Sequence, residues 1–194
     1  MHKYKLKIVI KEKAAFFKEA IKSFKTSGTL TPSSRFLVKR ILSKIEYTNS
    51  KLIVEYGSGN GIITKEILKR IEPSTTLICF EVNEVFYNKL KKIQHKQLII
   101  LNTSAENIQQ EIEKLGFLKV DNIISSLPLT MLPKELSKTI IENSYKVLEE
   151  KGRFVQFQYT IQFLKQFKAI FNKKVKLDFE PLNIPPAFLY VCEK

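Results

Sequence analysis

Three closely spaced glycines mark the part of the sequence that is best suited to bind a ligand. An apolar strand, Leu52-Ile-Val-Glu-Tyr, runs into Gly57, Gly59 and Gly61, and a helix follows at once. Glycine lets the chain turn tightly and lets a ligand approach the backbone. The spacing differs from the Gly-x-Gly-x-x-Gly of dinucleotide folds and from the Gly-Lys-Ser/Thr ending of a phosphate-binding loop. Glu55, two residues before the first glycine, instead suits a ligand with an amino group or a positive charge.

These features point to S-adenosylmethionine as the ligand. The next predicted strand ends in Glu81, 20 residues after Gly61. A carboxylate at that place can accept hydrogen bonds from both ribose hydroxyls of a bound adenosine. Val82 and Asn83 follow at a helix start, where we expect them to flank the adenine ring. The residues expected in the cofactor loop itself are Glu55, Gly57, Ser58, Gly59, Asn60 and Gly61.

Two further strands end in polar segments that belong at the same edge of such a sheet. The third strand leads into Ser104 and Ala105, and the fourth leads through Ser125 and Ser126 into Leu127-Pro-Leu. Ligands of open α/β sheets bind outside the carboxyl ends of the strands, where the strand order reverses. We therefore expect Ser104, Ala105 and Ser125 to complete the cofactor site. The glycine loop alone would be a weaker signal than this combination.

Strand and helix alternate from residue 51 onward, which predicts a mostly parallel α/β sheet with helices on both faces. The expected strands are 51–56, 76–81, 97–101, 120–125, 153–159, 174–180 and 187–192. The expected helices between them are 62–72, 84–95, 105–115, 134–149 and 160–172. The last two strands follow each other without a helix, so they predict a hairpin at one edge of the sheet.

The N-terminal region differs from the rest in its charge. The chain carries 33 Lys or Arg and 19 Asp or Glu, a net charge of +14, and residues 1–50 alone hold twelve basic residues against three Glu. This excess indicates a polyanionic partner, either nucleic acid or an anionic membrane surface, although a genome rich in A and T would also favour lysine. Residues 11–25 predict an amphipathic helix that either caps the core or lies in a membrane interface. We divide the chain into an N-terminal helical segment, 1–48, and a cofactor-binding domain, 49–194.

Several classes of protein are excluded by what the sequence lacks. With 44% hydrophobic residues in 194, the chain can bury a core, which excludes disorder. Cys79 and Cys192 lie in strand-like apolar runs, are too few for a disulfide framework or a four-ligand zinc site, and are expected to be buried thiols. We see no metal-ligand spacing, no run of about 18 apolar residues, and no secretory signal. A cytoplasmic protein is expected.

At these residues the sequence resembles the class I S-adenosylmethionine-dependent methyltransferases, whose fold is Rossmann-like with seven strands. More narrowly, it resembles the short bacterial phospholipid N-methyltransferases, which are related to ribosomal RNA adenine dimethyltransferases. The narrower resemblance rests on the Pro32-Ser-Ser-Arg35 turn, the Ser125-Ser-Leu-Pro-Leu129 segment and the ending Asn183-Ile-Pro-Pro186. It implies methylation of phosphatidylethanolamine toward phosphatidylcholine by a peripheral protein at the inner face of the cytoplasmic membrane. Where that family has Gly-Asp-Ala after the third strand, this chain has Thr103-Ser-Ala, so Ser104 would hold the adenine amine more weakly.

The resemblance also suggests which residues meet the methyl acceptor. Tyr159, with an aromatic face for a methylated cation, and Ser126 are the expected catalytic residues. Leu127 and Pro128 are expected to line the substrate pocket. Ser34 and Arg35 are candidates to hold the lipid phosphate, although Ser34 also suits a helix N-cap, and Tyr159 also suits a rim position that packs on the next helix.

Two alternatives remain open from the sequence. The ribosomal RNA enzymes carry Asn-Leu-Pro-Tyr/Phe where this chain has Ser126-Leu-Pro-Leu129. A flipped adenine needs an aromatic face for stacking, which Leu129 lacks. The chain also ends after the seventh predicted strand, without an added RNA-binding domain, so a nucleic-acid substrate is the less favoured interpretation. The second alternative is a protein that binds S-adenosylmethionine without catalysis.

Overall fold

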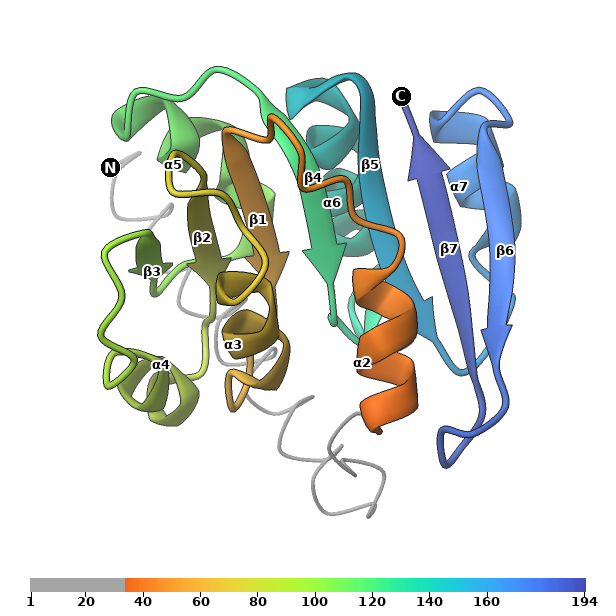
Figure 1. Ribbon diagram of the computed structural model, residues 1–194. Helices are drawn as coiled ribbons and strands as arrows, with labels where there is room; N and C mark the ends of the chain where they lie inside the picture. Colours follow the sequence, from red (N-terminus) through yellow and green to blue (C-terminus); the bar gives the residue numbers. More distant parts are fainter. Residues whose placement is uncertain (1–33) are drawn as a thin grey trace, which may run out of the picture.

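The apolar runs of the sequence form the strands of one mixed sheet in the computed structural model, which describes residues 34–194 (Figure 1). The strand order is β3-β2-β1-β4-β5-β7-β6. The strands are β1 Leu52–Tyr56, β2 Thr76–Phe80, β3 Leu98–Leu101, β4 Val120–Ser125, β5 Leu148–Gln158, β6 Val175–Glu180 and β7 Ala187–Glu193. Strands β1 to β5 pair in parallel, and β7 lies antiparallel between β5 and β6. The predicted seven-stranded sheet and its terminal hairpin are confirmed.

Helices cover both faces of this sheet, as Figure 1 shows. The α-helices are α2 Arg35–Leu42, α3 Ile62–Leu68, α4 Glu84–Leu90, α5 Ile108–Lys114, α6 Lys134–Val147 and α7 Leu164–Ile170. Two short 3-10 turns, η1 Ala105–Asn107 and η2 Leu129–Met131, precede α5 and α6. On one face, α2 and α3 pack on Ile53 and Leu77; on the other, α5, α6 and α7 pack on Val54 and Ile78. Because both faces are covered, all five residues of β1 are buried and the strand shows no polar alternation.

Helix α2 is part of this core. Its Leu37, Val38, Ile41 and Leu42 are buried among residues of β1, β2 and β7. Ser34 is its N-cap, since the hydroxyl accepts the Leu37 N–H at 3.2 Å, as one interpretation of the sequence held. Arg40 pairs with Glu180 at 2.6 Å and with Asp178 at 3.2 Å, which fastens the helix to β6. The domain boundary near residue 48 stays a prediction, and the predicted helix 11–25 lies outside the described residues.

The beginning of β5 is the main difference from the expected elements. The strand begins at Leu148, whereas the apolar pattern predicted a start at 153. Its pairing with β4 shifts between Val120 and Asn122, and Lys151 has a φ of 66°. A side chain on the following Gly152 would place its Cβ 2.8 Å from the Glu149 carbonyl oxygen. A charged, bulged stretch of this kind has no apolar periodicity, which is why the sequence pattern did not indicate a strand.

Within residues 34–194, no helix has the length and apolar character needed to cross a membrane. Cys79 and Cys192 are free and buried, as predicted.

Replacing Gly61 by alanine should lower the free energy of unfolding by about 2–4 kcal/mol, as measured by urea denaturation. Gly61 has a φ of 78°, and an added Cβ would lie 3.0 Å from side-chain carbons of Leu90 and Ile93. Gly116→Ala is the matched control, because Gly116 has a φ of 84° and nothing within 4 Å of the added atom. The control should lose only the stability that the backbone strain at a positive φ costs, about 1–2 kcal/mol. Equal losses in the two variants would contradict the close packing of α4 against the glycine loop.

Candidate active site

The glycine loop connects β1 to α3 at the carboxyl edge of the sheet. Its first amide continues the sheet, because the Gly57 N–H donates to the Phe80 carbonyl at 2.9 Å. The Gly61 N–H then donates to the Ser58 carbonyl at 2.9 Å and closes a tight turn. Gly59, at the centre, has a φ of 54°, and the space in front of it is open apart from the Gly57 carbonyl oxygen. The loop therefore presents bare backbone to the edge at which ligands of such folds bind.

The Glu81 carboxylate ties this loop to the end of β2. One oxygen accepts the Gly59 N–H at 2.9 Å and the other accepts the Asn83 N–H at 2.8 Å. Asn83 in turn caps α4, since its side-chain oxygen accepts the N–H groups of Val85 and Phe86. Glu81 is 3% exposed, and Val82 beside it is half-buried. The predicted ribose acceptor thus stands directly beside the predicted cofactor loop.

Glu55 lies beneath the loop. Its carboxylate is buried and accepts hydrogen bonds from the Thr64 hydroxyl of α3 at 2.6 Å and the Cys79 thiol of β2 at 3.4 Å. Burial raises the pKa of Glu55 to about 7, and the hydrogen bonds from Thr64 and Cys79 oppose this rise. Burial also raises the pKa of the Cys79 thiol, and the neighbouring Glu55 carboxylate adds to that rise. In this arrangement Glu55 holds the loop from below, and direct contact with a ligand stays a prediction.

The remaining predicted cofactor residues lie around the same edge. Ser58 is buried, and its hydroxyl has no hydrogen-bond partner of good geometry among the described residues. Asn60 is exposed on the loop. Ser104 precedes η1 and is half-buried, whereas Ala105 is buried. Asn102 was not among the predicted site residues. Its side-chain amide donates to the Glu81 carbonyl at 2.8 Å and joins the end of β3 to β2.

Residues 125–129, here called the acceptor segment, follow β4. The Ser126 N–H donates to the Tyr56 carbonyl at 2.9 Å, and the Ser125 hydroxyl accepts the Leu127 N–H at 3.4 Å. The Leu127 carbonyl accepts two side-chain amides of β5, from Gln156 and from Gln158, each at 3.0 Å. Both glutamines are buried, and the side-chain oxygen of Gln156 has no partner among the described residues.

These two glutamines were not identified from the sequence. The available signal was two polar residues at alternate positions of an otherwise apolar strand, Phe154-Val-Gln-Phe-Gln158. Alternate residues of a strand share one face, so both amides reach the same carbonyl. They fix the backbone of the acceptor segment from the neighbouring strand.

Tyr159, Ser34 and Asn183 come together from three distant parts of the chain. The Ser34 N–H donates to the Asn183 side-chain oxygen at 3.0 Å, and the Asn183 amide donates to the Pro185 carbonyl at 2.7 Å. Burial raises the pKa of Tyr159, and a hydrogen bond with Asn183 partly offsets the rise. Asn183 is 3% exposed and was not among the predicted site residues. Arg35 is exposed, with its guanidinium 4.9 Å from the centroid of the Phe36 ring.

Among residues 34–194, no group of three or more His, Cys, Asp or Glu side chains is arranged to hold a metal ion. A model of the ribosomal RNA adenine dimethylase family matches residues 32–169. The chain belongs to this family. As a member it is an S-adenosylmethionine-dependent methyltransferase. The residues of the loop fit that cofactor, because the space in front of Gly59 is open and the Gly59 N–H lies on the Glu81 carboxylate at the same edge of the sheet.

Two relatives cover the chain to different extents. The ornithine lipid N-methyltransferase of Singulisphaera acidiphila is 29% identical over 167 residues, which are 85% of this chain and 87% of that protein. The ribosomal RNA small subunit methyltransferase A of Mycoplasma mycoides subsp. mycoides is 31% identical over 107 residues, 54% of this chain and 39% of that protein. The alignment with the second relative thus spans well under half of that protein.

The fold is also similar to solved methyltransferases. The O-methyltransferase from Bacillus cereus in complex with SAH superposes with a TM-score of 0.66 at 12% identity, covering 93% of this chain and 91% of that one. At this identity the likeness concerns the fold alone.

Changing Glu81 to glutamine should weaken cofactor binding about 10–100-fold, as measured by isothermal titration with S-adenosylhomocysteine. The amide nitrogen cannot accept the N–H of Gly59 or of Asn83, and the negative charge is lost. Glu84→Gln is the control, because Glu84 is an exposed acid three residues further along the chain. Unchanged affinity in Glu81→Gln would remove Glu81 from the cofactor site.

Glu55 should make the stability of the fold depend on pH. Its pKa is about 7 in the folded chain and near 4.5 when unfolded, so the folded state holds the proton more tightly. Its contribution to the free energy of unfolding is therefore fully present below pH 4.5 and is lost as the pH rises to about 7. The loss amounts to about 3 kcal/mol. The difference in unfolding free energy between the wild type and Glu55→Gln, measured in urea from pH 4 to 8, should follow this curve. A difference that is constant with pH would contradict the burial of an isolated carboxyl.

Proposed function

We propose that this chain transfers methyl groups from S-adenosylmethionine to the amine of a membrane lipid. The observation that carries the proposal is the extent of similarity: 87% of the ornithine lipid N-methyltransferase is covered, against 39% of the ribosomal RNA methyltransferase. Phosphatidylethanolamine, the acceptor expected from the sequence resemblance, and ornithine lipid both present an amine at a membrane surface. We place the protein at the inner face of the cytoplasmic membrane.

The acceptor segment supports a small amine over a flipped base. Leu129 is 1% exposed, so the position that would stack a base holds a buried aliphatic side chain. The Leu127 carbonyl already accepts three N–H groups, from the side chains of Gln156 and Gln158 and from the backbone of Leu129. That carbonyl is therefore not free to accept the exocyclic amine of an adenine.

The chain's own residues supply position and environment for the transfer. When bound, the cofactor would supply an electrophilic methyl group on its sulfonium. A neutral amine that attacks this carbon in line would form the N–C bond as the S–C bond breaks and S-adenosylhomocysteine leaves. A site lined by the buried acceptor segment disfavours the ammonium form of the substrate, because burial lowers the pKa of an amine. Tyr159, half-buried at the end of β5, offers an aromatic face to the methylated cation. Arg35 is exposed at the start of α2, and we expect it to meet an anionic group of the lipid headgroup.

Ribosomal RNA adenine methylation is the second candidate, because the family model and the Mycoplasma mycoides relative both favour it. The polyanionic backbone of RNA would also suit the net charge of +14. It differs from the first proposal in the acceptor alone, so one assay separates the two.

The test is transfer of labelled methyl from S-adenosylmethionine by the full chain. We expect label in vesicles that contain phosphatidylethanolamine or ornithine lipid within phosphatidylglycerol, and none in ribosomal RNA. The two lipids are tested in separate assays, so that the result identifies the headgroup that is methylated. Glu81→Gln serves as the control with weakened cofactor binding. Label in ribosomal RNA and none in either lipid would establish the second candidate. Cofactor binding with no transfer to any of the three would overturn both.

A further inference from the structure

The turn between β6 and β7 is apolar although it is exposed. Its sequence is Pro181-Leu-Asn-Ile-Pro-Pro186, and no charged residue occurs from Pro181 to Cys192 in a chain that is 27% charged. Leu182 is 60% exposed and Ile184 is 80% exposed. Exposed turns usually carry polar residues, and large apolar side chains held in water at such a place indicate a contact surface.

The turn is held in a fixed shape from within. Asn183, between the two exposed side chains, is buried and bonded to the Ser34 N–H and the Pro185 carbonyl. Glu180, which precedes the turn, accepts the Leu182 N–H at 2.9 Å and pairs with Arg40. The buried polar groups are satisfied inside while Leu182 and Ile184 face outward, so the apolar surface is presented by a rigid support.

Two further exposed apolar residues lie on segments joined to this turn. Phe36 is 39% exposed and follows Ser34, which is bonded to Asn183. Ile161 is 51% exposed and follows Tyr159, which also bonds to Asn183. We call Phe36, Ile161, Leu182 and Ile184 the apolar rim. It borders the acceptor side of the site, because β5 and β6 both end at the edge that carries the glycine loop (Figure 1).

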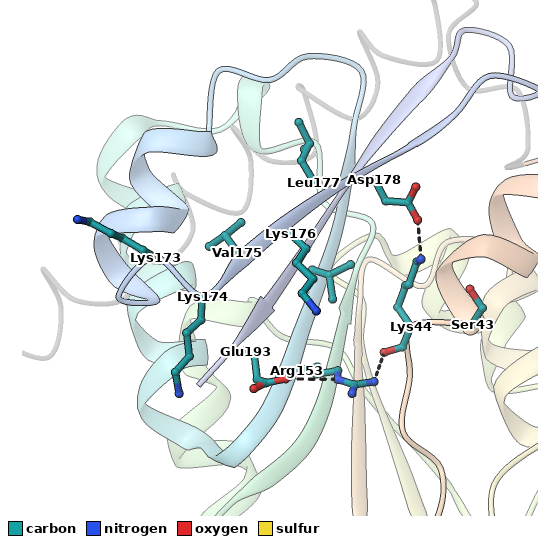
Figure 2. Close-up of a pocket in the computed structure, with 11 residues that line it drawn as sticks. Ser43, Lys44, Arg153, Lys173, Lys174, Val175, Lys176, Leu177, Asp178 and Glu193 are labelled. Atoms are coloured by element: carbon teal, nitrogen blue, oxygen red, sulfur yellow. Dashed lines mark hydrogen bonds and ion pairs between the residues drawn. The ribbon is translucent and has the colours of Figure 1, made fainter.

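The exposed charges on the segments that carry the rim are positive. Residues 34–36, 159–165 and 181–188 contain Arg35 and Lys165, both exposed, and no Asp or Glu. Glu180, directly before the turn, is buried and paired with Arg40. A different basic cluster lies at the opposite edge of the sheet, in a pocket of about 610 Å³ near the start of β6. There, Lys44 pairs with Asp178 and Arg153 faces Glu193, as Figure 2 shows. Exposed apolar side chains flanked by exposed cations are typical of elements that enter the interface of an anionic bilayer.

We infer that the apolar rim docks this protein on an anionic lipid bilayer, with Leu182 and Ile184 inserted beside the mouth of the acceptor site. The inference rests on the proposed lipid substrate and adds where the membrane meets the enzyme. A lipid amine would then reach the acceptor segment without leaving the bilayer.

The experiment is flotation of the full chain with vesicles of phosphatidylcholine containing about one third phosphatidylglycerol, without S-adenosylmethionine. The double variant Leu182→Asp/Ile184→Asp should bind at least about tenfold more weakly than the wild type. Leu118→Asp is the matched control, because Leu118 is 79% exposed at the opposite edge of the sheet, and it should bind as the wild type does. Titration with S-adenosylhomocysteine should give equal affinities for all three proteins, which shows that the variants are folded.

Three results would overturn the inference: no binding of the wild type to these vesicles, equal binding of the wild type and the double variant, or a wild type that is dimeric in solution with a monomeric double variant. The last would assign the rim to a second copy of the chain. Because flotation needs no methyl transfer, these results are independent of the assay of the proposed function. In turnover assays, the double variant should lose activity on vesicles and keep it on a short-chain, monomeric lipid amine.

Discussion

The hydrogen bond between the Glu81 carboxylate and the Gly59 N–H is the interaction on which the shape of the glycine loop depends. A glycine-rich loop has little side-chain contact of its own, so its shape must be imposed by the elements around it. Glu81 does this from β2 by accepting two backbone N–H groups, one from the loop and one from Asn83 at the start of α4. Hydrogen bonds to an ionised acceptor are among the stronger ones in proteins. Glu55 completes the support from below, through Thr64 and Cys79.

The acceptor side is organised by buried amides instead of carboxylates. Gln156 and Gln158 fix the Leu127 carbonyl, and Asn183 joins the start of α2 to the last turn of the chain. Neutral amides hold backbone in place without adding charge, which would suit the proposed amine acceptor, since that amine must stay unprotonated to attack. The two sides of the predicted site thus differ: a carboxylate holds the glycine loop, and amides hold the acceptor segment.

The layout of the sheet, and the meeting of the glycine loop with Glu81 at one edge of it, were predictable because they depend on local signals. Apolar runs, glycine spacing and an acid at the end of β2 are all contained within short stretches of sequence. The acceptor side was predictable only in part, because it depends on pairs that are far apart in the chain. Ser34 and Asn183 are 149 residues apart, and Leu127 and Gln158 are 31 apart. No periodicity relates such residues, and the bulged start of β5, with Lys151 at a positive φ, likewise has no apolar pattern.

The most direct measurement of the central claim is a crystal structure of this protein with S-adenosylhomocysteine. The account predicts density for the nucleoside at the carboxyl edge, with its ribose on the Glu81 carboxylate and its amino acid portion over the bare backbone at Gly59. Density for the ligand at another place, or a glycine loop covered by side chains in the complex, would contradict it.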